Sequence, residues 1–172
     1  VRVRGRHRHR ETAEDLGRLM SGYGRVIGAR VFEHHKLERM ASVASVPVVN
    51  LLSDDAHPVQ TLADLLTLRQ CFGRLDGLTV TYVGDANNVA RSLAIGCGLV
   101  GAAFRISSPP GYRFDDTSTD RIRSAGTDLT VIERVVNLDY GWVDYELRRG
   151  AGKPERAVLH GKQDKDDLMN PF

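Results

Sequence analysis

The sequence predicts an α/β fold with an open, mainly parallel sheet and flanking helices. Short apolar runs, as in residues 46–50 and 78–84, alternate along the chain with stretches whose apolar residues recur at helical spacing. With 172 residues and 41% hydrophobic content, the chain can bury one ordinary core or form two incomplete half-domains. Ligands of such sheets bind beyond the carboxyl ends of the strands, so the loops that follow the strands are the first places to search for a site.

The first part of the chain predicts a basic arm and two helix and strand pairs. Arginine occupies every second position from Arg2 to Arg10, so we expect a solvated, disordered arm over residues 1–10, with nucleic-acid binding through phosphates as the alternative. Residues 11–22 predict a helix and residues 25–32 a strand; a second helix and a buried parallel strand over residues 46–50 follow. The apolar faces of the two helices are Ala13, Leu16, Leu19 and Met20, and Phe32, Leu37, Met40, Ala41 and Ala44.

The middle of the chain continues this alternation. A helix begins at Pro58 with Leu62, Leu65 and Leu66 at helical spacing, and the glycines of residues 73–77 end it. Strands are predicted over residues 78–84, 102–107 and 128–132, with helices over residues 88–100 and 116–125 between them. Residues 136–172 form a polar and aromatic tail without a predicted element.

The turn that leads into the helix at Pro58 is the first candidate site. Pro58 suits the first helical position because its missing N–H costs nothing there. His57 and Gln60 then lie at the helix entrance, where free N–H groups and the helix dipole favour a small, electron-rich carbonyl group or an anion. The alternative is that His57 only caps the helix and that Gln60 is solvated.

The turn after the strand of residues 78–84 is the second candidate site. Ala86 and Val89 stand where a nucleotide-binding loop needs its second and third glycine, so the turn predicts a polar clamp and not a pyrophosphate cradle. An asparagine at a helix entrance offers a donor and an acceptor, which suits the ammonium and carboxylate groups of an amino acid. Asn87 and Asn88 are also common capping residues, and capping is the alternative.

Metal, disulfide and membrane chemistry are not expected. His34 and His35 are neighbours that diverge by about 100° on a helix, so they cannot chelate one metal ion together. Cys71 and Cys97 lie in apolar helical contexts, which predicts buried free thiols in a reducing compartment. No apolar run approaches the roughly twenty residues of a membrane helix and no secretory signal is present, so we expect a cytoplasmic protein without a membrane partner.

Three linked motifs stand out in the sequence. They are Ser45 to Leu52, then His57-Pro58-Val59-Gln60 with Ala63-Asp64-Leu65, and Tyr82-Val83-Gly84-Asp85-Ala86-Asn87-Asn88. Together they resemble the ornithine carbamoyltransferases, and the resemblance runs in order over residues 10–132. The Asn87-Asn88 pair favours the ornithine enzymes over the sister aspartate enzymes, which share a similar histidine, proline and glutamine arrangement.

This resemblance implies transfer of a carbamoyl group from carbamoyl phosphate to L-ornithine, giving citrulline and phosphate in arginine biosynthesis or ornithine metabolism. Arg30 and His57 would be catalytic, because donors aimed at the carbonyl oxygen stabilise the negative charge that grows there. Pro58, Val59 and Gln60 would complete the carbamoyl phosphate site, with Gln60 orienting the carbamoyl nitrogen. Arg30 can also be a surface arginine of its strand.

The resemblance further implies that Asn88, with Asn87 beside it, holds L-ornithine. No metal or organic cofactor is implied, because phosphate is already a good leaving group. Two incomplete carbamoyltransferase-type half-domains follow: residues 11–72 as the C-terminal part of the carbamoyl phosphate-binding domain and residues 73–135 as the N-terminal part of the ornithine-binding domain. Residues 136–172 would be a divergent tail.

Three motifs of this family have no counterpart in the sequence. They are the phosphate-binding loop of serine, threonine, arginine and threonine, the ornithine-binding motif of aspartate, serine, methionine and glycine, and the late cysteine loop. The chain also starts at Val1, so we expect a fragment or truncated member whose transfer activity and family-type homotrimer are weakened or lost. The alternative function is a non-catalytic protein that still binds carbamoyl phosphate or an amino acid.

Overall fold

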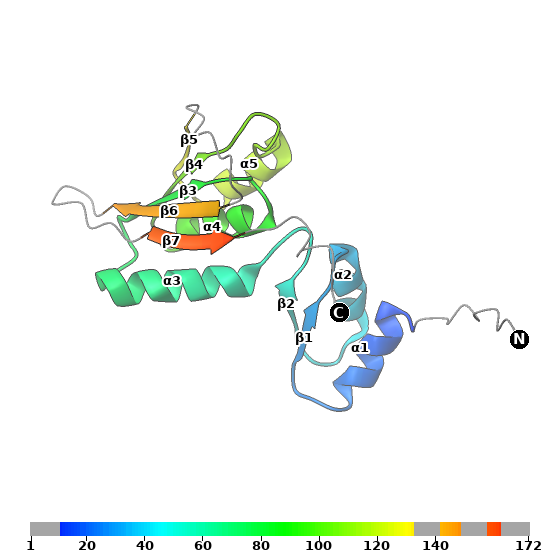
Figure 1. The fold of residues 1–172 in the computed structure, drawn as a ribbon. Helices are drawn as coiled ribbons and strands as arrows, with labels where there is room; N and C mark the ends of the chain where they lie inside the picture. Colours follow the sequence, from blue (N-terminus) through cyan, green and yellow to red (C-terminus); the bar gives the residue numbers. More distant parts are fainter. Residues whose placement is uncertain (1–10, 133–141, 149–157, 163–172) are drawn as a thin grey trace, which may run out of the picture. The chain divides into compact units, whose positions relative to one another are not determined.

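A computed structural model describes residues 11–132, 142–148 and 158–162 and divides the chain into two compact units, Val1–Asp55 and Ala56–Phe172. The helices and strands predicted between residues 11 and 132 are all present (Figure 1). The basic arm of residues 1–10 lies outside the described residues. Within the described part, no helix combines the length and the hydrophobicity that a membrane crossing requires.

The first unit packs two helices against a pair of parallel strands. α1 (Ala13–Ser21) begins with a capping box between Thr12 and Asp15, and α2 (His34–Val43) packs beside it. The close approach depends on Gly17, where an added Cβ would lie 2.7 Å from the Met40 carbonyl oxygen. β1 (Ile27–Arg30) pairs in parallel with β2 (Val48–Leu52).

The strand β2 is less buried than its apolar sequence predicts. Its residues alternate between half-buried and exposed, and Val49 and Leu51 are each 39% exposed. The prediction of a parallel strand is confirmed, whereas the prediction of a buried one is wrong. The reason is that the helices of this unit cover one face of the two strands, so every second side chain remains accessible.

The second unit is built on a five-stranded sheet in the order β5-β4-β3-β6-β7. β3 (Thr79–Val83), β4 (Ala103–Ser107) and β5 (Leu129–Val131) are parallel, as predicted, and are linked by α4 (Asn88–Leu99) and α5 (Asp116–Ser124). β6 (Trp142–Arg148) and β7 (Val158–Lys162) are antiparallel strands in the tail, for which the sequence predicted no element. A short connection suffices between antiparallel strands, so two neighbouring strands fit into this tail.

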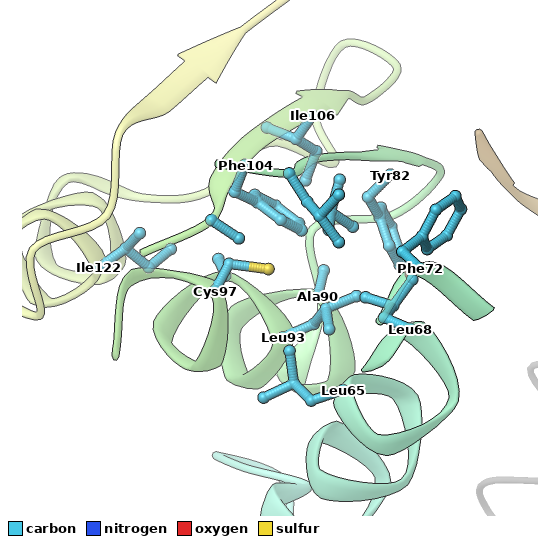
Figure 2. Packing of buried hydrophobic residues seen from close by; sticks show 14 residues of the cluster. Leu65, Leu68, Phe72, Tyr82, Ala90, Leu93, Cys97, Phe104, Ile106 and Ile122 are labelled. Atoms are coloured by element: carbon cyan, nitrogen blue, oxygen red, sulfur yellow. The ribbon is translucent and has the colours of Figure 1, made fainter. Parts of the chain in front are cut away.

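The core of the second unit lies between the sheet and the helices α3 (Pro58–Phe72) and α4. Figure 2 shows Leu65, Leu68 and Phe72 of α3 in one buried cluster with Leu93 and Cys97 of α4. Side chains of β3 and β4 complete this cluster, among them Tyr82, Phe104 and Ile106, which are at most 2% exposed. α3 therefore packs as part of the second unit.

The buried face of α3 differs from the predicted one. Leu65 is buried as predicted, but Leu62 and Leu66 are 66% and 56% exposed. The buried stripe is Thr61, Leu65, Leu68 and Phe72. Since α3 carries apolar residues on more than one side, only its packing against α4 decides which side is buried.

Candidate active site

The start of α3 places His57 against α4. Pro58 occupies the first turn as predicted, and His57 is the N-cap residue but makes no side-chain cap hydrogen bond. The backbone N–H of His57 instead donates to the hydroxyl of Ser92 on α4 (N···Oγ 2.8 Å). The His57 side chain is half-buried, and Pro58 and Val59 are exposed beside it. Capping through the imidazole, the alternative to a ligand role, does not occur.

Gln60 lies on the exposed first turn of α3 and is held by Asp64 one turn further on. Its amide nitrogen donates to the Asp64 carboxylate (Nε2···Oδ1 2.9 Å), so the side chain is oriented and not merely solvated. An ionised carboxylate only accepts hydrogen bonds, so this contact fixes which end of the amide faces Asp64. The amide oxygen of Gln60 then points away from Asp64.

Asp64 itself sits in an apolar setting. Its Oδ2 atom is buried without a hydrogen-bond partner among the described residues. Burial raises the pKa of the Asp64 carboxyl, and the hydrogen bond from Gln60 opposes this effect. The pKa of the Cys97 thiol is raised to about 12, mainly by burial and to a smaller extent by the negative charge of Asp64. Gln60 is therefore held by a half-buried carboxyl group that lies where α3 and α4 meet.

The second turn delivers Asn87 and Asn88 to the start of α4. Asn87 caps the helix, because its side-chain oxygen accepts from the backbone N–H groups of Val89 (3.0 Å) and Ala90 (3.1 Å). The side-chain oxygen of Asn88 also accepts from Val89 N–H, at 3.0 Å. Capping, the alternative weighed for these residues, is therefore confirmed for Asn87. The side-chain oxygens of both asparagines therefore accept from the backbone of α4.

A residue that the sequence analysis missed joins the two turns. The Ser92 hydroxyl donates to the backbone carbonyl of Asn88 (2.8 Å) while it accepts from the His57 N–H. The feature of the sequence that points to Ser92 is its position four residues after Asn88, one helical turn away on the same face. A serine at that spacing usually bonds only within its own helix, so the contact with His57 was not predictable.

Arg30 lies in the first unit, whereas His57, Gln60, Asn87 and Asn88 lie in the second. It is an exposed residue at the end of β1, where the pairing with β2 changes register after Ala29. Its convergence on the same ligand as His57 remains a prediction.

The histidines and cysteines occupy other roles. The described residues contain no group of three or more histidine, cysteine or acidic side chains that could hold a metal ion. The His34 side chain is half-buried, and its ring nitrogen Nδ1 lies 2.8 Å from the Ser53 hydroxyl. Cys97 is a buried free thiol as predicted, but Cys71 is exposed because it lies off the buried stripe of α3.

Comparison with known proteins supports two linked domains of one family. Residues 3–70 match the model of the aspartate/ornithine carbamoyltransferase carbamoyl-P binding domain, and residues 76–136 match that of the Asp/Orn binding domain. Among similar proteins, an ornithine carbamoyltransferase of Bacillus subtilis is 42% identical over 157 residues, covering 87% of this chain and 49% of that protein. One of Haloquadratum walsbyi is 43% identical over 125 residues, covering 73% and 42%.

Solved structures give the same result. The ornithine carbamoyltransferase of Thermus thermophilus matches with a TM-score of 0.64 and 43% identity, covering 72% of this chain and 41% of that one. The enzyme of Pyrococcus furiosus matches with a TM-score of 0.67 and 38% identity, covering 75% and 42%. The α/β architecture of this chain is therefore that of a carbamoyltransferase-type protein. The chain belongs to the aspartate/ornithine carbamoyltransferase family, and it spans somewhat less than half the length of these relatives.

Proposed function

We propose that this chain carries the ligand-binding turns for carbamoyl transfer from carbamoyl phosphate to L-ornithine, giving L-citrulline and phosphate. The observation that supports this most directly is that one hydroxyl, that of Ser92, joins the His57 turn to the Asn88 turn. The turn expected for carbamoyl phosphate and the turn expected for ornithine therefore adjoin within one unit. The names of the relatives, ornithine carbamoyltransferase, agree with this substrate pair.

The chemistry assigns each turn a separate task. The amine of ornithine bonds to the carbonyl carbon and loses a proton, while the bond from that carbon to the phosphate oxygen breaks. His57 donates to the carbonyl oxygen, where negative charge grows, and Arg30 of the first unit is proposed for this role from the family resemblance alone. Gln60 accepts from the carbamoyl nitrogen through the amide oxygen that the Asp64 contact directs away from the carboxylate.

The Asn87 and Asn88 turn suits the amino-acid end of ornithine. The amide groups of both asparagines carry N–H donors, and the helix entrance adds a positive dipole. Donors at a positive helix entrance favour the carboxylate group of the amino acid.

The remaining assignments follow from this proposal. Residues 11–72 would carry the carbamoyl phosphate half of the protein and residues 73–135 the ornithine half, in the cytoplasm and in arginine biosynthesis or ornithine metabolism. The phosphate-binding loop expected from the family is not among the 172 residues. We therefore propose slow or absent turnover by this chain alone, weak ligand binding, and a weakened or absent family-type homotrimer.

A citrulline assay together with calorimetry tests this proposal. We expect carbamoyl phosphate to bind weakly, His57→Ala to abolish the binding signal, and the exposed Leu66→Ala variant on the same helix to leave it unchanged. Citrulline formation that His57→Ala removes would show the transfer activity itself. If carbamoyl phosphate does not bind at millimolar concentration, or binds equally well to His57→Ala, the proposed site is wrong. Robust turnover by the chain alone would refute the slow activity.

A further inference from the structure

Ser92 uses its hydroxyl twice, in contacts with two different elements. It accepts from the backbone N–H of His57 at the start of α3 and donates to the backbone carbonyl of Asn88 at the start of α4, each at 2.8 Å. A hydroxyl has a single proton to donate, and here that proton is committed to Asn88. The two contacts therefore fix the backbone of one turn relative to the backbone of the other.

The helices around Ser92 pack so closely that they leave little room for another residue to connect the starts of α3 and α4. One turn further along α4, a Cβ added at Gly96 would clash with Thr61 of α3, so the two helices approach closely there. Ser92 is half-buried within this interface. Alanine at position 92 would keep the helix but leave the His57 N–H without this acceptor, whereas threonine keeps a hydroxyl that can bond to the carbonyl four residues earlier.

We propose that Ser92 is a positioning residue that sets the spacing between the carbamoyl-binding turn at His57 and the amino-acid-binding turn at Asn88. The inference rests on the proposed function, because it assigns Ser92 to the same site. Its consequence is energetic coupling: a ligand that orders one turn prepares the other turn through Ser92. Such coupling is reciprocal, so each ligand strengthens the binding of the other by the same factor.

The first experiment needs no ligand. Amide hydrogen exchange of the full chain, measured by NMR, is compared for wild type, Ser92→Ala and Ser92→Thr. Losing one hydrogen bond of ordinary net strength corresponds to exchange at the His57 N–H that is about 3- to 10-fold faster. We expect this increase in Ser92→Ala and recovery in Ser92→Thr. Unchanged exchange at His57 in Ser92→Ala would overturn the inference at its structural basis.

The second experiment measures coupling by calorimetry. The probes are carbamoyl phosphate and L-norvaline, which is ornithine without the attacking amine, so no transfer consumes the ligands. In wild type, carbamoyl phosphate should tighten L-norvaline binding, and Ser92→Ala should reduce this factor about 3- to 10-fold, toward one. Ser92→Thr should restore it. The matched control is Thr67→Ala, which removes a hydroxyl bonded to the Ala63 carbonyl within α3 and should leave the coupling unchanged.

The outcomes separate this inference from the function on which it rests. If wild type binds neither probe at millimolar concentration, the proposed function fails and the coupling role of Ser92 fails with it. If wild type binds both probes with coupling, and Ser92→Ala keeps the wild-type factor, only the role of Ser92 is refuted. Equal loss in Ser92→Ala and Thr67→Ala also refutes it, because a general weakening of the helices would then account for the result.

Discussion

The two helices that carry the candidate site begin in different ways. At the start of α4, the Asn87 side chain caps the helix by accepting from two backbone N–H groups. At the start of α3, Pro58 removes one N–H donor, His57 makes no side-chain cap hydrogen bond, and the backbone N–H of His57 donates to the Ser92 hydroxyl of α4. One entrance is stabilised by its own side chain, and the other by a contact with the neighbouring helix.

At the start of α4, one side chain both stabilises the helix and belongs to the candidate site, whereas at the start of α3 different residues have these two roles. The oxygen of Asn87 is committed to the helix, so replacing Asn87 changes the stability of α4 as well as the site. The imidazole of His57 makes no cap hydrogen bond to α3, so replacing it removes no helix cap. The position of the α3 entrance depends instead on Ser92 and on the packing of α3 against α4.

The largest expected effect comes from breaking that packing. Leu65 is buried against α4, whereas Leu66, its neighbour in sequence, is 56% exposed. We expect Leu65→Ala to lower the free energy of unfolding by about 3 kcal/mol, because it leaves a cavity, and Leu66→Ala to change it by less than about 0.5 kcal/mol. Urea unfolding followed by circular dichroism measures both. Equal losses would show that the buried face of α3 is assigned wrongly.

A smaller effect is expected where the two helices meet most closely. A Cβ at Gly96 would clash with the Cγ2 methyl of Thr61, a short side chain that cannot swing away. Alanine also favours helix formation, so we expect a net loss of only about 1 to 2 kcal/mol for Gly96→Ala. Thr61→Ser removes the clashing methyl, and the double variant should recover most of the stability lost. A double variant no better than Gly96→Ala would contradict the close contact.

The starts of α3 and α4 could be predicted from the sequence better than the contacts that hold them in place. Pro58, the run of apolar strands and the asparagine pair are local signals, and each element between residues 11 and 132 was found where they indicate. The buried side of α3 and the role of Ser92 depend on which helix lies alongside, and periodicity cannot supply that information. The strands β6 and β7 were missed because β6 pairs with β3 across more than sixty positions, and β7 in turn pairs with β6.

Alanine substitutions of Asn87 and His57 compare the starts of α4 and α3 directly. Asn87→Ala removes a capping side chain, and we expect it to lower the free energy of unfolding by about 1 kcal/mol. His57→Ala removes no cap, so its effect should stay within about 0.5 kcal/mol, while binding of carbamoyl phosphate is lost. Thermal unfolding and calorimetry on the same samples give both values. The contrast between the entrances fails if His57→Ala destabilises the chain as much as Asn87→Ala does.

The smallest expected effect concerns the acid that orients Gln60 at the α3 entrance. Burial raises the pKa of Asp64, so between its unfolded and folded pKa values the folded chain binds a proton that the unfolded chain has lost. The stability contributed by Asp64 is therefore complete below the unfolded pKa, near 3.9, and is lost as the pH rises through the folded value.

Asp64→Asn keeps an oxygen that accepts from Gln60 but cannot ionise. The variant should therefore match wild type at about pH 3 and become the more stable protein towards pH 7, with Asp120→Asn on the exposed surface of α5 as the control. Urea unfolding across this pH range measures the difference. If Asp64→Asn and wild type instead differ in stability towards low pH, the folded chain favours ionised Asp64. The contact with Gln60 would then outweigh the cost of burial.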